Sequence, residues 1–291
     1  MINFINGQTK VYGVIGDPIS HTLSPQIHSY FADLSNKNMA YLPFYVKGMA
    51  LGDAIRGAHA LGIHGINVTV PHKKAVMPFL SDMDPMAERV GSVNTLVRKN
   101  DGYIGYNTDY IGIEQTLAAL GLSFEGKRVA VIGAGGSAYA ACVAAAENNA
   151  SYLGIINRTI SNSEILASHV KKYYNILVEL QVEDSDKEYD MILQTTTLGF
   201  GELKDRSPAT STAIFSNVQL VFDFIYSPWE TLFLQQAKAA GVSNIVNGFP
   251  MLVHQAAAAF SLWHDEKLEM GDHVETIAEL CRQKSRWVDA N

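Results

Sequence analysis

The chain has 291 residues, of which 47% are hydrophobic and 18% are charged, and this composition excludes a disordered protein. Its 22 basic and 29 acidic side chains give a formal net charge of −7, which argues against nucleic acid or an anionic membrane as the main partner. No apolar run reaches the roughly 18 residues of a membrane span, and residues 1–7 do not resemble a signal peptide. The two cysteines form no disulfide framework, and the histidines show no familiar metal spacing. We therefore expect a cytoplasmic protein without a metal.

The first predicted strand covers residues 11–16, and a loop with two hydroxyl side chains follows it. Thr22 and Ser24 lie just before a helix that we expect from Pro25 to Leu34, with Ser24 as its N-cap. Hydroxyls and the N–H groups of a helix start all donate hydrogen bonds, so the pair suits a carboxylate. The alternative is that Ser24 is only a cap and Thr22 only a loop residue.

A strand at 40–46, a helix at 49–61 and a strand at 66–70 come next, and this alternation favours a mostly parallel sheet. Pro71 cannot donate to a sheet ladder, so the third strand should end there. Ligands of α/β proteins gather beyond the carboxyl ends of strands, so Lys73 in the following turn is well placed to point into a crevice. The alternative is an ordinary surface lysine.

A helix ending near Gly91 precedes a predicted hairpin, because Asp-Gly in the turn at 99–102 separates two apolar runs. The second run ends at Asp109, and a helix starts near Tyr110. Asp109 is either the N-cap of this helix or a carboxylate that faces Lys73. Asn94 offers a donor and an acceptor to a polyhydroxylated ligand, although an isolated asparagine is more often structural.

A dinucleotide-binding turn is predicted between the apolar strand at 129–132 and an alanine-rich helix that ends near Asn149. Its glycines permit a tight turn and close approach to a pyrophosphate, and the helix start supplies positive potential. The residues of this turn are Gly133, Ala134, Gly135, Gly136, Ser137 and Ala138.

The end of the next strand, at 152–156, bears on the choice of dinucleotide. An NAD-selective site usually places an acidic residue here to hold the ribose 2′-hydroxyl, and this chain has none. Arg158, between Asn157 and Thr159, suits a 2′-phosphate instead. The sequence therefore predicts NADP, with NAD possible because the nearby Asn162 is neutral.

The rest of the chain continues the alternation of strands and helices. Further strands are predicted at 179–182, 189–194, 218–224 and 244–246, and a helix at 231–240. The polar residues at 195–199 should face the cofactor from the carboxyl edge of the sheet. Gly248–Pro250 is interpreted as a break, followed by a helix from Met251 through Trp263. The tail from Glu266 to Asn291 is predicted to be helical.

Several of these motifs, in the same order, resemble the shikimate dehydrogenase family from about Tyr12 to His264. Besides the glycine turn and Asn157–Thr159, they are Ser20–Pro25, Asn67–Lys73, Val93–Thr95, Asn107–Asp109 and Met251–Gln255. The resemblance implies that Lys73 is the catalytic acid/base and Asp109 its partner. It implies substrate contacts through the carboxylate-binding Thr22 and Ser24, the hydroxyl-binding Thr69, Asn94, Asp109 and Gln255, and Tyr226. It also implies that Phe224 and Gly248 line the nicotinamide end of the cofactor.

Elementary chemistry agrees with the role of Lys73. Reduction of a ring ketone needs a hydride from a nicotinamide and a proton on the developing alkoxide. A lysine ammonium stabilises that charge and donates the proton, and Asp109 would orient the lysine while favouring its charged form.

Four positions depart from the family pattern. Thr22 replaces a serine, which keeps the hydroxyl but adds a methyl group to the carboxylate pocket. His72 stands where phenylalanine is common, and we assign it no catalytic role. Asn162 replaces a second basic residue, and Pro250 replaces a glycine beside the cofactor. These changes leave the choice of substrate and cofactor open.

The expected architecture is α/β with two domains and an active site in the cleft between them. Residues 1–110 and 247–291 would form the substrate domain, and residues 111–246 a Rossmann-like NADP-binding domain. The predicted activity is the NADP-linked reversible reduction of 3-dehydroshikimate to shikimate, in chorismate and aromatic amino acid biosynthesis. The alternatives are a quinate/shikimate dehydrogenase that uses NAD or both cofactors, and a nucleotide sensor without turnover. We expect a monomer or a homodimer.

Overall fold

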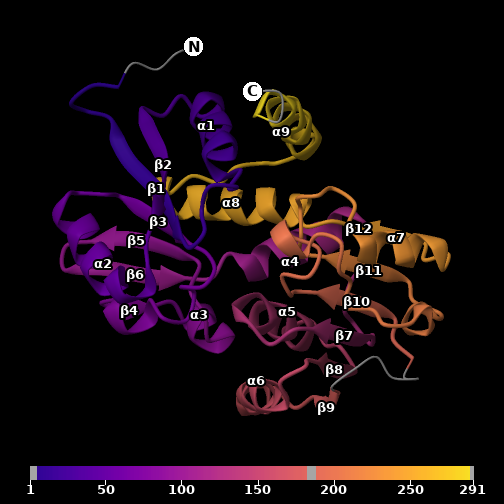
Figure 1. The fold of residues 1–291 in the computed structure, drawn as a ribbon. Coiled ribbons are helices and arrows are strands. Elements are labelled where there is room, and N and C mark those ends of the chain that lie inside the picture. Colours follow the sequence, from indigo (N-terminus) through magenta and orange to yellow (C-terminus); the bar gives the residue numbers. More distant parts are fainter. Residues whose placement is uncertain (1–4, 182–187, 289–291) are drawn as a thin grey trace. The chain divides into compact units, whose positions relative to one another are not determined.

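The computed structural model describes residues 5–181 and 188–288, and the chain divides into two compact units (Figure 1). Unit 1 contains the described residues up to Gly112 and those from Val253 onward, and unit 2 runs from Ile113 to Leu252. Both units are α/β, each with a six-stranded sheet. Within the described residues, none of the helices combines the length and hydrophobicity that crossing a membrane requires.

The sheet of unit 1 has the strand order β2-β1-β3-β5-β6-β4. Its first three strands pair in parallel, β5 is antiparallel to both of its neighbours, and β4 is parallel to β6. The strands are β1 (Lys10–Gly16), β2 (Met39–Tyr45), β3 (Gly65–Val68), β4 (Asp82–Met83), β5 (Thr95–Lys99) and β6 (Gly102–Tyr106). The helices are α1 (Ser24–Leu34), α2 (Leu51–Ala60), α3 (Pro85–Val90) and α9 (His273–Val288), with short 3₁₀ helices at Gly48–Ala50 and Met77–Phe79.

Apolar residues on the strands and helices of unit 1 explain why these elements form a sheet with helical cover. Ile15, Ile66 and Val68 on the strands are buried with Leu51 and Ile55 of α2 in one hydrophobic cluster. Leu51 and Ile55 lie one turn apart, so they share a helix face. This packing fixes the carboxyl end of β3, from which the chain continues to Lys73.

Unit 2 has the strand order β12-β11-β10-β7-β8-β9, and every pair is parallel. This is the order of a doubly wound dinucleotide-binding sheet. The strands are β7 (Arg128–Ile132), β8 (Tyr152–Ile156), β9 (Leu177–Gln181), β10 (Met191–Gln194), β11 (Leu220–Asp223) and β12 (Asn244–Val246). The helices are α5 (Gly136–Glu147), α6 (Ile160–Tyr173) and α7 (Leu232–Ala239), with short 3₁₀ helices at Gly201–Leu203 and Thr212–Phe215. The division between the units falls within α4 (Asp109–Ala119) and α8 (Phe249–His264).

Several predicted element boundaries were wrong. The strand predicted at 66–70 ends at Val68, before the bend that leads into Pro71. Ser24 is the first residue of α1 and not its N-cap, which is Leu23. The segment Gly248–Pro250 does not break the chain, because α8 already begins at Phe249. A proline in the first turn of a helix loses no hydrogen bond, since its missing N–H would have no partner in the helix.

Two further predictions lie partly outside the described residues. The strand predicted at 179–182 corresponds to β9, and Val182 is outside the described residues. The predicted tail helix corresponds to α9, which begins at His273 and not near Glu266, and residues 289–291 are again outside. In Figure 1, α9 lies beside α1, and the Tyr30 hydroxyl is hydrogen-bonded to His273 Nδ1 at 2.7 Å.

Candidate active site

Lys73 lies in the turn that follows β3, and backbone bonds hold this turn on both sides. The carbonyl of Thr69 accepts from the N–H of His72 at 2.8 Å, and the carbonyl of Lys73 accepts from Val93 N–H at 2.8 Å. The buried His72 side chain bonds through Nε2 to the carbonyl of Val46 at 2.6 Å. His72 therefore anchors the turn from inside unit 1.

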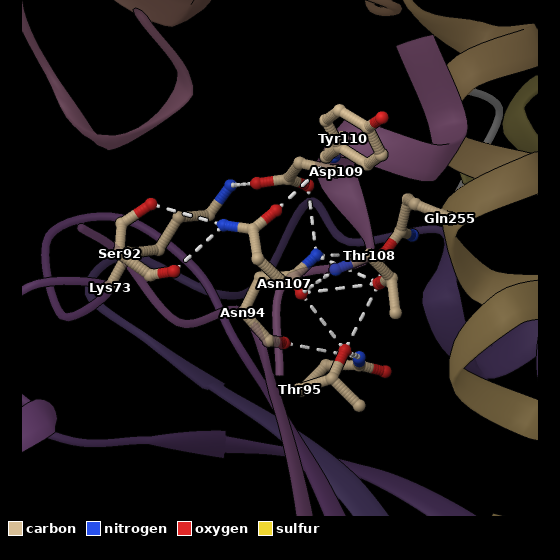
Figure 2. A network of polar contacts seen from close by, with 10 residues as sticks. Lys73, Ser92, Asn94, Thr95, Asn107, Thr108, Asp109, Tyr110 and Gln255 are labelled. Carbon is tan, nitrogen blue, oxygen red and sulfur yellow. Dashed lines mark hydrogen bonds and ion pairs between the residues drawn. The ribbon is translucent and has the colours of Figure 1, made fainter. Parts of the chain in front are cut away.

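The Lys73 ammonium donates to Asp109 Oδ2 at 2.6 Å, and the two side chains are only 12% and 5% exposed (Figure 2). Asp109 is the first residue of α4, where the positive end of the helix dipole favours a carboxylate. Asn107 Oδ1 accepts from the N–H of Tyr110 at 3.2 Å, which is the bond that an N-capping side chain makes. The Asp109 carboxylate is thus held against a cation in a site with little water.

Asn94 is the centre of the polar network in Figure 2 and is 2% exposed. Its Nδ2 donates to Asp109 Oδ1 at 2.9 Å and to Gln255 Oε1 at 3.3 Å. Its Oδ1 accepts from the N–H of Thr108 at 2.7 Å. Because a backbone N–H can only donate, this bond fixes the orientation of the amide and turns Nδ2 toward the carboxylate. Asn94 therefore positions Asp109 for Lys73.

Gln255 comes from α8 and reaches the same network from the far end of the chain. Its Oε1 also accepts from the Thr108 hydroxyl at 3.5 Å.

Thr69 follows β3 and is partly buried, and its N–H donates to the carbonyl of Ile15 at 3.0 Å. A Cβ on Gly16 would lie 2.6 Å from the Thr69 methyl, so only glycine allows this approach.

Thr22 and Ser24 are joined by two hydrogen bonds at the start of α1. The Thr22 hydroxyl donates to Ser24 Oγ at 3.1 Å and accepts from the N–H of Ser24 at 3.2 Å. Ser24 is 7% exposed. The predicted pair of hydroxyls is therefore a single ordered unit, with the side chain of Thr22 turned toward the first N–H of the helix.

Sequence reasoning left four residues of this network without a role: Asn67, Thr95, Asn107 and Thr108. Thr95 and Thr108 hydroxyls contact one another at 3.1 Å, and Thr108 donates to Asn94 at 3.1 Å. Asn107 Nδ2 donates to the carbonyl of Ser92 at 2.8 Å. All four are polar residues within or beside apolar runs, and that contrast was the signal for a buried network.

The glycine turn of unit 2 has the geometry that a pyrophosphate needs. Gly133 has φ +117°, and a Cβ there would lie 2.6 Å from Thr195 Oγ1, so glycine is required. A Cβ on Gly135 would meet nothing within 4 Å, and Gly135 is the N-cap of α5 without a side-chain cap. An anion at this end would meet backbone N–H groups and the positive end of the helix dipole. Gly136, Ser137 and Ala138 form the first turn of that helix.

Arg158 follows β8 with an exposed side chain. Among the described residues it has no hydrogen bond or ion pair, so its charge is available to a ligand phosphate. Asn157 beside it donates through Nδ2 to the carbonyl of Thr159 at 2.8 Å, which holds the bend before α6. Asn162 lies exposed in the first turn of α6 and adds no charge.

The carboxyl ends of β10 and β11 are tied together by two buried side chains. Gln194 Nε2 donates to Asp223 Oδ1 at 3.2 Å and to the carbonyl of Leu198 at 2.9 Å. The Thr231 hydroxyl donates to Asp223 Oδ2 at 2.6 Å. Burial raises the pKa of Asp223 to about 6. These bonds shape the polar loop that was expected to face the cofactor.

Phe224 and Gly248 meet beside this loop, because a Cβ on Gly248 would lie 2.1 Å from the carbonyl of Phe224. The N–H of Phe224 donates to the carbonyl of Gln194 at 2.9 Å. Tyr226 is half-buried, and it belongs to unit 2, whereas the other residues predicted to bind substrate belong to unit 1. The residues predicted to form the site are thus divided between the two units.

Comparisons with known proteins show what the chain is similar to. A family model described as the shikimate dehydrogenase substrate binding domain matches residues 14–96. The shikimate dehydrogenase (NADP(+)) of Caldanaerobacter subterraneus subsp. tengcongensis is 39% identical over 90% of this chain and 94% of its own.

Two solved structures have the same fold over nearly the whole chain. A shikimate dehydrogenase in complex with NADP+ has a TM-score of 0.86 and 33% identity, covering 95% of this chain and 97% of its own. The shikimate 5-dehydrogenase of Listeria monocytogenes, in complex with shikimate and NAD, has a TM-score of 0.84 and 29% identity, covering 95% of this chain and 98% of its own. With its two α/β units, its buried lysine–aspartate pair and its glycine turn, the chain belongs to the shikimate dehydrogenase family.

Proposed function

We propose that the protein is an NADP-dependent shikimate dehydrogenase, which reversibly reduces 3-dehydroshikimate to shikimate. The observation that carries this proposal is the buried contact between Lys73 and Asp109, at 2.6 Å, in a member of this family. A sensor that binds nucleotide without turnover has no use for a desolvated acid–base pair, so we do not favour that alternative.

In this proposal, Lys73 donates the proton that the ketone oxygen of 3-dehydroshikimate needs as it becomes an alkoxide. The Asp109 carboxylate accepts a hydrogen bond from the Lys73 ammonium and fixes its orientation. Asn94 in turn holds this carboxylate in place through its 2.9 Å hydrogen bond. In the reverse direction Lys73 receives the proton of the shikimate hydroxyl. General acid–base catalysis of this kind contributes about 10²- to 10⁴-fold to a rate.

The remaining residues of unit 1 would bind the substrate. Thr22 and Ser24 offer hydroxyls and a helix start to the carboxylate. Thr69, Asn94 and Gln255 offer donors and acceptors to the ring hydroxyls. Tyr226, which belongs to unit 2, also matches a substrate-binding position of the family and is proposed as a further substrate contact.

Unit 2 would bind the cofactor. The start of α5, from Gly133 to Ala138, would hold the pyrophosphate, and Arg158 with Asn157 and Thr159 would hold the 2′-phosphate of the adenosine. Phe224 and Gly248 would line the nicotinamide end. NADPH, when bound, supplies the hydride of the reduction. We also propose a cytoplasmic location, and the two buried cysteine thiols are in keeping with it, since neither is in a disulfide.

The test is an initial-rate assay of NAD(P)H absorbance with shikimate and quinate, each paired with NADP and with NAD. We expect turnover of shikimate with NADP at least about tenfold above the other three pairs. A preference for quinate or for NAD would identify the alternative dehydrogenase, with Thr22 and Asn162 as the first residues to exchange. Cofactor binding without turnover of any pair would contradict the proposal.

A further inference from the structure

Asp223, the last residue of β11, is the one acidic or basic side chain that is buried among the described residues of unit 2, and it is 0% exposed. Acidic side chains are rarely buried without a cation, because burial removes the water that stabilises their charge. In the part of the chain that the structure describes, no lysine, arginine or histidine pairs with Asp223. A negative charge without a cationic partner therefore lies at the carboxyl edge of this sheet.

Three neutral donors hold the Asp223 carboxylate. Its Oδ1 accepts from Ile225 N–H at 3.0 Å and from Gln194 Nε2 at 3.2 Å, and its Oδ2 accepts from the Thr231 hydroxyl at 2.6 Å. Gln194 cannot present its oxygen instead, because that oxygen accepts from the backbone N–H of Thr196. Donors of this kind favour the charged form of a carboxylate. Because burial raises the pKa of Asp223 only to about 6, the group is an anion at neutral pH.

This carboxylate is bonded into the residues that are proposed to line the nicotinamide end of the cofactor. Phe224 directly follows Asp223, and the bond from Ile225 N–H turns the carboxylate back along the backbone of Phe224. The carbonyl of Phe224 lies against Gly248, where a Cβ would be 2.1 Å away. The N–H of Gly248 donates to the carbonyl of Ile225 at 2.9 Å. The buried charge and the proposed nicotinamide contacts thus belong to one small cluster.

The strand order places the same cluster in the nicotinamide half of the sheet. A doubly wound sheet binds one nucleotide on each side of its first strand, which here is β7. Arg158 follows β8 on one side, where we propose that it holds the 2′-phosphate of the adenosine. The nicotinamide then belongs on the other side, beyond β10 and β11, and Asp223 ends β11.

The two redox forms of the cofactor differ in charge at this end. The nicotinamide ring of NADP+ is positively charged, and it becomes neutral when it takes up a hydride to form NADPH. The phosphates are the same in both forms, so the start of α5 and Arg158 act on both alike. A charge near the ring acts on only one of them. Since water and salt screen a buried charge much less than an exposed one, the field of Asp223 is retained in the site.

We propose that Asp223 is a specificity-determining residue for the redox state of the cofactor, and that its buried carboxylate favours NADP+ over NADPH. This rests on the proposed function, in which unit 2 binds NADP. Asp223 acts across the backbone of Phe224 and does not touch the cofactor. Its charge shifts the balance between the two bound forms toward the oxidised one, and thus toward the form that accepts a hydride from shikimate.

The test is calorimetric titration of the protein with NADP+ and with NADPH, at about pH 8, where Asp223 is ionised. Asp223→Asn removes the charge and keeps the shape. We expect its Kd for NADP+ to rise about fivefold or more, with the Kd for NADPH within about twofold of wild type. The rise should persist in about 0.5 M salt, because the charge is buried.

Thr231→Val is the matched control, because it removes the 2.6 Å bond to the same carboxylate and keeps the charge. A general loosening of the cluster would weaken both forms alike, so the ratio of the two Kd values in this variant should stay within about twofold of wild type. Asp223→Glu, which restores the charge, should also bring the ratio back to within about twofold. An unchanged ratio in Asp223→Asn, or an equal rise of both Kd values, would overturn the proposal.

Should Asp223→Asn fail to fold, a double variant removes the same charge. Asp223→Leu with Thr231→Val deletes the carboxylate together with its shortest donor, so that the hydroxyl is not left buried without an acceptor. The same rise in the ratio of the two Kd values is expected relative to Thr231→Val alone. A ratio equal to that of Thr231→Val would reject the role of Asp223.

Binding is measured independently of turnover, which separates this proposal from the proposed function. A wild-type protein that binds both forms but does not turn over shikimate would reject the proposed function, and the ratio would still decide the role of Asp223. A wild-type protein that binds neither form would overturn both.

Discussion

The two units differ in the groups that they offer to a ligand, which are buried side chains in unit 1 and backbone groups in unit 2. In unit 1, the network around Asn94 consists of buried side chains bound to one another, and Asp109 and Lys73 already form an ion pair. In unit 2, the glycine turn offers backbone and a helix start, and Arg158 is exposed. A network of side chains fixes the position of the Lys73 ammonium. A turn built from backbone can accept any pyrophosphate, and we propose that the choice between dinucleotides depends on the exposed Arg158.

Replacing Lys73 should have the largest effect on activity, because it removes the proposed proton donor from the preorganised unit. For Lys73→Ala we expect kcat to fall by about 10³-fold or more, with the affinity for NADP unchanged. Lys74→Ala, the neighbouring lysine, is the control and should stay within about threefold of wild type. Stopped-flow or steady-state rates with fluorescence titration of NADP measure both quantities. Loss of NADP affinity in Lys73→Ala would show that the two units are not independent in this respect.

Acid should destabilise unit 1 through His28. Burial lowers the pKa of His28 to about 3, from 6.5 in an unfolded chain. The unfolded state therefore binds the proton first, so the stability that this residue contributes is present above about pH 6.5 and is lost as the pH falls toward 3. Between pH 7 and pH 4 the loss amounts to about 3 kcal/mol. His28→Phe should lose less stability over that range.

Urea unfolding at both pH values tests this expectation, with the exposed His21→Gln as the control that keeps the wild-type dependence. The contribution of Asp223, in unit 2, to stability changes with pH in the opposite direction. Its folded pKa is raised to about 6, so its contribution falls as the pH rises from about 4 to 6. An identical pH dependence in wild type and His28→Phe would contradict the assignment of acid sensitivity to His28.

Arg158 should decide between the two cofactors. Arg158→Ala removes the cation that we expect at the 2′-phosphate, so the KM for NADP should rise about tenfold or more while the KM for NAD stays within about twofold. Arg56→Ala, an exposed arginine of unit 1 that pairs with Asp53, is the control. Equal changes for the two cofactors would mean that selectivity lies elsewhere in unit 2.

The smallest effect is expected at Asn162, where the family often has a second basic residue. Asn162→Arg adds a charge at an exposed position, and exposed charge pairs contribute only about 0.2–1 kcal/mol. The KM for NADP should therefore fall about two- to fivefold, and the gain should shrink at high salt. Asn162→Gln, which adds length without charge, should have no effect. A gain with Gln would show that contact and not charge matters here.

The sequence analysis was most accurate where backbone and burial decide the structure. The strand at 129–132 and the glycine turn have a strict local pattern, so β7 and the start of α5 could be predicted from neighbouring residues. Element ends were less accurate, as at Ser24 and Phe249, because a cap depends on which of several adjacent polar groups reaches the helix start.

The polar network could be predicted only in part, and the reason is distance along the chain. Lys73 and Asp109 stood out through the family motifs, and Asn67 belongs to one of these motifs but received no role. Its side chain binds the carbonyl of Asn94 and the hydroxyl of Thr95 beside the neighbouring strand, and no local pattern contains these bonds. The contact of Asn94 with Gln255 could not be predicted either, because the two residues are 161 positions apart in the sequence.

The contact between Asn94 and Gln255 has a consequence for the synthesis of the protein. Gln255 and Asn94 are separated by 161 residues, and unit 1 draws on both ends of the chain while unit 2 is continuous. Chains are synthesised from the N-terminus, and domains fold as units. The sheet of unit 2 can therefore form on the ribosome before α8, which completes unit 1, has been synthesised. Lys73 is synthesised early, yet the network around it is completed only once Gln255 of α8 has emerged. A newly made molecule should therefore gain the ability to hold dinucleotide before it gains turnover.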